Sequence, residues 1–300
     1  MQRGISTGLT GRRRIENCSN YGKMQGYIAA GITTDRGTSI INNCANYQEV
    51  RGKINSGGIS ASSSSYELNI YNCFNLANIS VDSSYVGGIS SDATNVVNCY
   101  NTGKITNQSS IAGGLIANSD KVFNCFNSGE VTLNGTFGYA CGIAGIGKAN
   151  AENCYNIGTV KSGTIATGIT GGMSAIKCYN SGRITGGKSP TGGIGGYNVS
   201  ASECYNTGDI TNSDNSQLGE IATSSATIQN CYYLEKTNNA PANGATAKSK
   251  AEMDQIMDMQ KFVDLLNQKV DEYNSQDTKE VELVKWKLKD GKPVFITEKD

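Results

Sequence analysis

The 300 residues carry 26 basic and 26 acidic side chains, so no net charge favours nucleic acid or an anionic membrane as a partner. No run of about 18 apolar residues predicts a membrane span, and the lack of histidine excludes Ser-His-Asp, Cys-His and histidine-based zinc sites from these residues. The 37 glycines and three prolines fit a chain with many corners, in which one repeat array takes up most of the length.

After a lead-in over residues 1–14, a repeat begins near Ile15 and continues to Tyr233. Each unit has an aliphatic residue or alanine three positions before a cysteine. An asparagine follows two positions after the cysteine, until Tyr233 breaks the series, and Ile, Val or Met follows six positions after it. The cysteines are 24 to 29 residues apart, most often 26, which is typical of a stacked-repeat architecture. They are Cys18, Cys44, Cys73, Cys99, Cys125, Cys154, Cys178, Cys204 and Cys231.

The residue types predict an all-β fold, a parallel β-helix (β-solenoid) of about eight to nine coils. Apolar positions are isolated or alternate, many are β-branched, and Gly, Asn, Ser and Thr fill the gaps, as short strands between corners require. Each unit is then one coil of about three strands, stacked about 4.8 Å from the next. Because like residues lie over like residues, we expect a buried column of free thiols and an internal hydrogen-bond ladder of asparagines. Close cysteine pairs suited to zinc do not occur, and no cofactor or metal is expected.

Side-chain parity predicts which residues face outward. A corner between Asn98 and Cys99 lets both the aliphatic position and the cysteine face inward, so the residue after the cysteine faces out. From the third coil on, that residue is aromatic. An exposed stripe of rings would stack sugars or meet a protein partner; alternatively, the rings brace the sheet or lie under a C-terminal helix. The candidate ligand-binding residues are Phe74, Tyr100, Phe126, Tyr155, Tyr179 and Tyr205.

The chain divides into three parts by composition. Residues 1–236 form the solenoid, residues 237–248 read as a linker because they hold a proline and a glycine among polar residues, and residues 249–300 form a capping element. Insertions near residues 62–66 and 133–139 lengthen two periods and are expected to bulge at corners.

The capping element begins with Ser249-Lys250-Ala251-Glu252, a capping-box sequence that opens a helix ending near Tyr273. A strand over residues 281–288, a tight turn at Asp290-Gly291 and a returning strand over residues 293–296 should follow. A helix and a hairpin cannot bury their own apolar side chains alone. We therefore expect them to pack on the open end or the flank of the solenoid.

The units resemble GLUG-motif repeats, named for a Gly-Leu-x-Gly core and found in large bacterial cell-surface and secreted proteins. The Asn-Cys-Tyr-Asn-x-Gly segment is also similar, and the resemblance covers about residues 15–233. Glu220 departs from the pattern by displacing a glycine before Ile221. The resemblance implies a surface location and roles such as adhesion or display, and some members of the family flank metallopeptidase domains. The core is clearest in Gly142-Ile143-Ala144-Gly145, Gly168-Ile169-Thr170-Gly171 and Gly193-Ile194-Gly195-Gly196.

A catalytic β-helix would need several carboxylates at matching positions of adjacent coils. The best candidate row lies five positions after each cysteine, but its charges have mixed signs and no two carboxylates are neighbours. This row therefore predicts a solvated face rather than an active site. It reads Lys23, Glu49, Asn78, Lys104, Glu130, Thr159, Arg183 and Asp209.

We therefore expect a non-catalytic extracellular module of a bacterial surface protein, which acts as a rigid spacer and as an adhesive or ligand-display surface. Its partner would be a host or bacterial surface glycan or protein, with no nucleic acid and no membrane insertion. The chain opens without a secretory signal, which favours an excerpt of a larger surface polypeptide over an intracellular protein. One alternative is a glycan-acting β-helix enzyme, a lyase or hydrolase. A second is a self-associating filament unit, because an uncovered first coil exposes a sheet edge.

Overall fold

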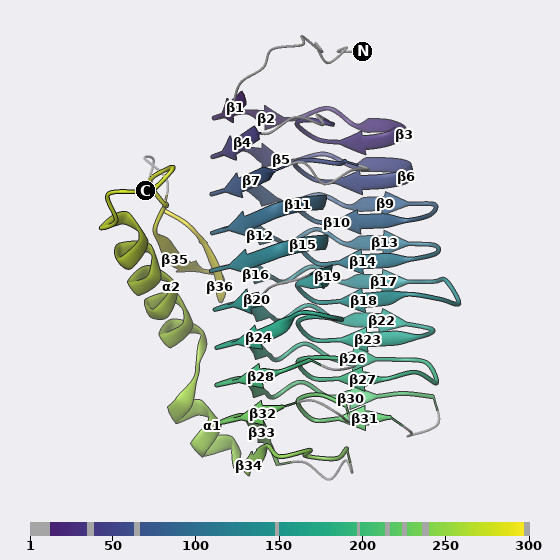
Figure 1. Ribbon diagram of the computed structural model, residues 1–300, viewed down its shortest axis with the longest axis vertical. Helices are drawn as coiled ribbons and strands as arrows, with labels where there is room; N and C mark the ends of the chain where they lie inside the picture. Colours follow the sequence, from purple (N-terminus) through teal and green to yellow (C-terminus); the bar gives the residue numbers. More distant parts are fainter. Residues whose placement is uncertain are drawn as a thin grey trace.

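The computed structural model describes residues 13–34, 39–62, 67–147, 150–196, 199–213, 217–223, 227–235 and 240–296. The chain forms a parallel β-solenoid of about eight turns, and a helical segment with a small antiparallel hairpin lies along its flank (Figure 1). The predicted fold class is confirmed.

Three parallel sheets run along the rod, and each of the first eight rungs contributes strands to all three. The first sheet carries the aliphatic position before each cysteine. In spatial order its strands are β1 (Arg13–Glu16), β4 (Ser39–Asn42), β7 (Leu68–Tyr71), β11 (Ser90–Val97), β15 (Ile116–Phe123), β20 (Asn150–Glu152), β24 (Ser174–Ile176), β28 (Ala201–Ser202) and β32 (Ile228–Gln229), with β19 (Ala144–Gly147) beside β15.

The second sheet carries the residue after each cysteine and the following asparagine. Its strands are short, because each rung turns again after two residues. In order they are β2 (Ser19–Asn20), β5 (Ala45–Asn46), β8 (Phe74–Asn75), β12 (Tyr100–Asn101), β16 (Phe126–Asn127), β21 (Tyr155–Asn156), β25 (Tyr179–Asn180), β29 (Tyr205–Asn206), β33 (Tyr232–Leu234) and β34 (Thr246–Lys248).

The third sheet is crossed twice by each middle rung, so a full turn there has four strands, such as β11 to β14, and not the three expected. Asn107 reverses the chain: its side chain donates to the carbonyl of Ile111 (2.8 Å) and accepts from the amide of Ser109 (2.8 Å). The strands in order are β30 (Ile210–Thr211), β26 (Ile184–Thr185), β22 (Val160–Ser162), β17 (Val131–Leu133), β13 (Ile105–Asn107), β9 (Ile79–Val81), β6 (Val50–Gly57), β10 (Tyr85–Gly87), β14 (Ile111–Gly113), β18 (Tyr139–Cys141), β23 (Ile165–Thr167), β27 (Thr191–Gly192) and β31 (Leu218–Gly219), with β3 (Met24–Ala30) beside β6.

The corner before each cysteine is a left-handed residue, as the parity argument predicts. Asparagine tolerates this conformation because its short amide bonds locally. Lys177 and Glu203 take the same conformation, and their side chains form an ion pair across the rungs at 3.8 Å. With φ between 50° and 58°, the corner residues are Asn17, Asn43, Asn72, Asn98, Asn124, Asn153, Lys177, Glu203 and Asn230.

The first glycine of each Gly-aliphatic core is required by close packing inside the rod. A Cβ atom on Gly114 would lie 1.9 Å from the carbonyl oxygen of Gly142 and 2.7 Å from Cγ of Asn127. No side chain fits at that spacing. The glycine and the asparagine ladder therefore form one packing unit, which explains why both recur with the same period.

The C-terminal segment runs back up the flank of the rod and is called the strap here (residues 249–296; Figure 1). The capping box at Ser249 and Glu252 is confirmed, but the expected single helix is two, α1 (Lys250–Ile256) and α2 (Met259–Asn274). The helix breaks because Met257 is extended and the Asp258 side chain caps α2 by accepting from the amide of Lys261 (2.8 Å). Neither helix is long and apolar enough to cross a membrane.

The hairpin comprises β35 (Trp286–Lys289) and β36 (Lys292–Phe295), joined by the expected turn, in which Asp290 has φ 50° and Gly291 has φ 71°. The first strand is shorter than predicted. Residues 281–285 form no strand, because their backbone bonds to the corner asparagines of the solenoid instead of to a second strand.

The lower end of the rod is closed by residues that the sequence analysis took for a linker. Strand β34 pairs with β33, the carbonyl of Pro241 accepts from the amide of Glu220 (3.0 Å), and Asn243 donates to the carbonyl of Ala222 (2.8 Å). The linker prediction is wrong for residues 240–248; residues 237–239 and the expected bulge at 63–66 lie outside the described part. The element that caps the end is thus the supposed linker, whereas the helices and hairpin cover the flank.

Candidate binding surfaces

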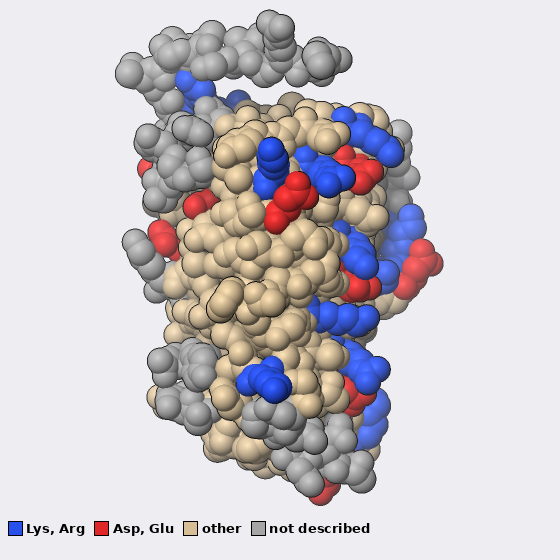
Figure 2. Space-filling model, turned by 90° about the vertical axis from the view of Figure 1, so that its right-hand side faces the viewer, with Lys and Arg blue, Asp and Glu red and all other residues tan. Residues whose placement is uncertain are grey.

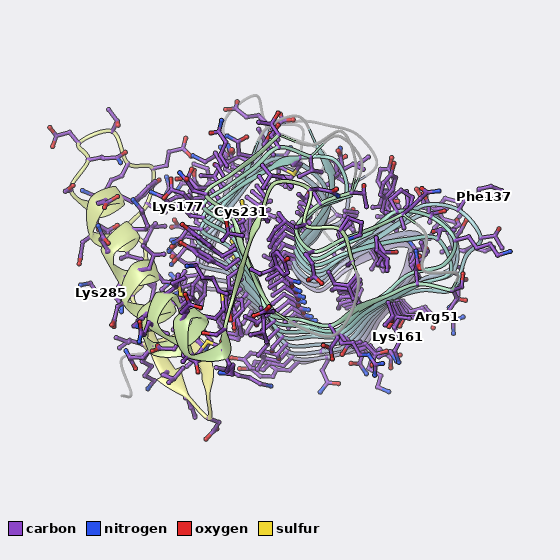
Figure 3. The ribbon with its side chains drawn as sticks, turned by 90° about the horizontal axis from the view of Figure 1, so that it is seen from below. Arg51, Phe137, Lys161, Lys177, Cys231 and Lys285 are labelled. Atoms are coloured by element: carbon purple, nitrogen blue, oxygen red, sulfur yellow. The ribbon has the colours of Figure 1, made fainter. Side chains whose placement is uncertain are left out.

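The cysteine column lies inside the rod from Cys44 to Cys231, and these eight thiols are free and buried, while Cys18 is free and exposed. Each rung is tied to the next through sulfur: the amide of Cys99 donates to Sγ of Cys125 (3.3 Å), and the Cys99 thiol donates to the carbonyl of Val97 (3.3 Å). Burial raises the pKa of Cys99, so the thiol stays protonated. Figure 3 shows Cys231 within the ring of strands.

Thiol labelling should report this arrangement directly. We expect a thiol reagent such as Ellman's reagent to label about one cysteine quickly in the native protein, namely Cys18, and all ten in urea. Reactivity requires an accessible thiolate, which the buried thiols lack. The variant Cys18→Ser should lose the fast phase altogether. Rapid native labelling of two or more sites would contradict the buried column.

The asparagine ladder predicted from the sequence is confirmed, and it continues without a break from the first to the eighth rung. The amide of Asn101 donates both to Oδ1 of Asn127 (2.8 Å) and to the carbonyl of Gly103 (2.8 Å), and its Oδ1 accepts from the amide of Gly103 (3.2 Å). The side chain therefore satisfies a corner and binds two rungs together. The members are Asn20, Asn46, Asn75, Asn101, Asn127, Asn156, Asn180 and Asn206.

The aromatic stripe does not lie free on the surface, so its interpretation as a ligand-binding site is corrected. The rings do point out of the solenoid, but the strap packs on them. Tyr155 meets Phe262 edge-on at 4.8 Å, and Tyr100 meets Phe295 at 5.0 Å. The physical reason is that two apolar surfaces of one chain, the ring column and the inner face of α2, bury each other. Tyr100, Phe126, Tyr155 and Tyr179 are buried, and Phe74 and Tyr205 are half-buried.

A second ladder, formed by the corner asparagines, fixes the strap in register. The Asn72 side chain donates to the carbonyl of Glu282 (2.8 Å) and accepts from the amide of Val284 (2.9 Å). Asn98 donates to the carbonyl of Val284 (2.8 Å) and accepts from Nε1 of Trp286 (2.6 Å). The sequence analysis noticed these asparagines only as corners, and the column of Asn at that position was the available signal.

A pair of tyrosines three positions after the first two cysteines remains outside the strap. Tyr21 and Tyr47 stack with ring centroids 4.8 Å apart and planes 5° apart, Tyr21 is 70% exposed, and Leu76 continues the column at 42% exposure. The phenol of Tyr47 has a raised pKa because of partial burial and the neighbouring Tyr21. The sequence analysis missed this pair, because it followed the position next to the cysteine.

A shallow depression of about 430 Å³ lies on the third sheet at the first three rungs, lined by Gln25, Gly26, Tyr27, Arg51, Gly52, Lys53 and Asp82. A β-bulge opens it, because one residue of β3, Tyr27, opposes two of β6. Tyr27 is 65% exposed, and Arg51 pairs with Asp82 at 3.4 Å. Figure 3 places Arg51 on the outer side of this sheet and Phe137, which is 81% exposed, at the tip of a turn.

The charged row five positions after each cysteine lies on the outer surface of the third sheet, where two pairs of its residues form ion pairs between rungs. Lys23 pairs with Glu49 at 3.4 Å and Lys104 with Glu130 at 3.1 Å. The pKa of Glu130 is lowered by the Thr132 hydroxyl and by Lys104. Charged side chains gather on one margin of the face in Figure 2, with both signs mixed and uncharged surface beside them. Alternating signs are therefore explained by pairing along the rod.

Comparison with known proteins adds little. No protein-family model matches the chain, and no curated protein matches it. Among solved structures, that of a "putative immunoglobulin A1 protease" from Bacteroides ovatus is similar, with a TM-score of 0.49 and 16% sequence identity. The alignment covers 88% of this chain and 87% of that one. The name describes the Bacteroides ovatus protein alone.

Proposed function

We propose that the chain is a non-catalytic extracellular repeat module of a bacterial surface protein, which serves as a rigid spacer and display surface. The observation that carries the proposal is the unbroken asparagine ladder, which bonds eight successive rungs through buried amides 2.7 to 2.9 Å apart. A flexible linker does not require a hydrogen-bonded interior of this kind, whereas a rigid spacer does. The resemblance of the repeats to GLUG-motif units supports the extracellular, bacterial assignment.

The strap supports the spacer role by bracing the rod on its flank. Its contacts extend from β33 near the lower end, which α1 touches, up to the first rung, where Arg14 donates to the carbonyl of Glu280 (3.3 Å). A stack of rungs resists compression well, but bending opens one side of it. An element that is bonded to rungs near both ends limits such bending, as a brace does.

Display would use the side chains that the strap leaves uncovered. Aromatic rings that stand in solvent suit stacking on a sugar or on an apolar protein surface. Here they are Tyr21, which stacks on the half-buried Tyr47, Tyr27 at the depression, and Phe137 at a turn. We propose a host or bacterial surface glycan or protein as the partner, held by these rings at fixed distances along the rod.

Hydrogen exchange with mass spectrometry tests the rigid-spacer function. Amides of the second-sheet strands β8, β12, β16, β21 and β25 should exchange together and at least about 100-fold more slowly than amides in the exposed turn at residues 134–138, because they open only with the ladder. In parallel, a panel of plant, bacterial and host polysaccharides incubated with the protein should release no new reducing ends or unsaturated products. Turn-like exchange in the ladder would reject the spacer, and product release would reject the non-catalytic assignment.

A further inference from the structure

The two ends of the rod differ within the described part of the chain. At the lower end residues 240–248 cover the last coil, and the Asn206 amide donates to Glu220 Oε2 (3.4 Å) because Tyr233 stands where the next ladder asparagine would be. At the upper end, β1, β2 and β3 each have a neighbouring rung on one side only. Cys18 is accordingly exposed, whereas its equivalents below are buried.

The ladders have a direction, which determines what the upper edge presents. In the ladder two residues after the cysteine, each asparagine side chain donates to the rung below, as Nδ2 of Asn20 does to Oδ1 of Asn46 (2.7 Å). At the corner the order is reversed, since Asn43 donates upward to Oδ1 of Asn17 (2.6 Å). Sulfur accepts from the rung above, as in the bond from the Cys18 amide to Sγ of Cys44 (3.4 Å). The first rung thus presents Oδ1 of Asn20 and Sγ of Cys18 as acceptors and Nδ2 of Asn17 as a donor.

We propose that this edge is a docking site for a further rung of the same Asn-Cys-x-Asn repeat, continuous in the chain with β1. The protein is then the lower, closed end of a longer solenoid. The inference rests on the proposed spacer function and names its structural partner. It is drawn from the polarity of the edge and from the closed lower end.

A rung of this repeat matches the edge group by group. Its ladder asparagine donates to Asn20, its corner asparagine accepts from Asn17, and the amide of its cysteine donates to the sulfur of Cys18. The same three bonds join the first rung to the second and the third rung to the fourth. Ile15, Met24 and Ile32, which are half-buried on the first rung, supply apolar area to cover. A second copy of the chain fits less well. Its lower end is closed, and like columns meeting head to head set acceptor against acceptor.

An inserted rung tests the proposal in the full chain. A copy of residues 68–93 placed between residues 12 and 13 continues in register, because residues 13 and 94 both lie five positions before a cysteine. The copy carries alanine in place of its own cysteine, so that Cys18 remains the reporter thiol. We expect labelling of Cys18 to slow at least about tenfold relative to the parent protein, because the new rung covers its sulfur.

The matched control is the same insertion with leucine at both asparagines of the copy that correspond to Asn72 and Asn75, which removes the acceptor and the donor. It should leave Cys18 as reactive as in the parent. Equal protection by both insertions would overturn the polarity argument, and no protection by either would overturn the docking site. A parent dimer in light scattering with a protected Cys18 would assign the edge to a second copy instead. None of these results affects the hydrogen-exchange test, so the spacer function and the docking site can be rejected separately.

Discussion

Replacing Asn101 with leucine is expected to lower the free energy of unfolding by about 3–6 kcal/mol, since it leaves several buried groups without partners at about 1–3 kcal/mol each. The side chain is fully buried, and it makes four hydrogen bonds, to Asn75, Asn127 and both backbone groups of Gly103. Leucine has a similar volume, so the loss reflects polar bonds rather than a cavity. Neighbouring rungs are affected as well, because the ladder is continuous.

Urea unfolding followed by the β-sheet signal in circular dichroism measures this loss, because the strands of the rungs supply most of that signal. The control is Asn134→Leu, at an exposed turn position, which should change stability by less than about 0.5 kcal/mol. If the two variants unfold at the same urea concentration, the ladder is not the source of rigidity, and the spacer function loses its main support.

The repeat core was predictable because one position with one environment recurs in every rung. Cysteine and asparagine at fixed spacing indicated inward columns, and a change in parity placed the corner at Asn98, where the structure has φ 54°. The doubled crossing of the third sheet was not predictable in this way. Its second strand holds small or varied residues, such as Ala112 and Thr191, so that no strong column marks it.

The fate of the aromatic column shows what parity alone leaves open. Parity says that Tyr100 points out of the solenoid, but it does not say whether water or another segment lies there. The inner face of α2 is also apolar, and the two surfaces bury each other. Two departures from the repeat, Glu220 and Tyr233, marked the closed end. Their role could be seen only in the structure, because both lie beside Asn206, the last asparagine of the ladder.

Replacing Trp286 with alanine is expected to release the strap while the rungs stay folded. Trp286 is 1% exposed, lies 4.5 Å from Phe295 between ring centroids, and donates to Asn98. Truncation of a buried tryptophan costs about 3–5 kcal/mol. That loss falls on the strap, because Asn98 keeps its bonds to the neighbouring asparagines of the corner ladder, Asn72 and Asn124.

Limited trypsin digestion measures the release, since three cleavable lysines lie in or beside the hairpin: Lys285, Lys287 and Lys289. Cleavage there should quicken by about two to three powers of ten, in proportion to the population of the open strap. Trp286→Phe keeps a ring but loses the bond to Asn98, so its cleavage rate should lie between those of the parent and of Trp286→Ala. Leu288→Ala changes a side chain that is 38% exposed, so its cleavage rate should match that of the parent. Unchanged digestion of Trp286→Ala would mean that α2 alone holds the strap, and a globally unfolded variant would mean that the rungs depend on it.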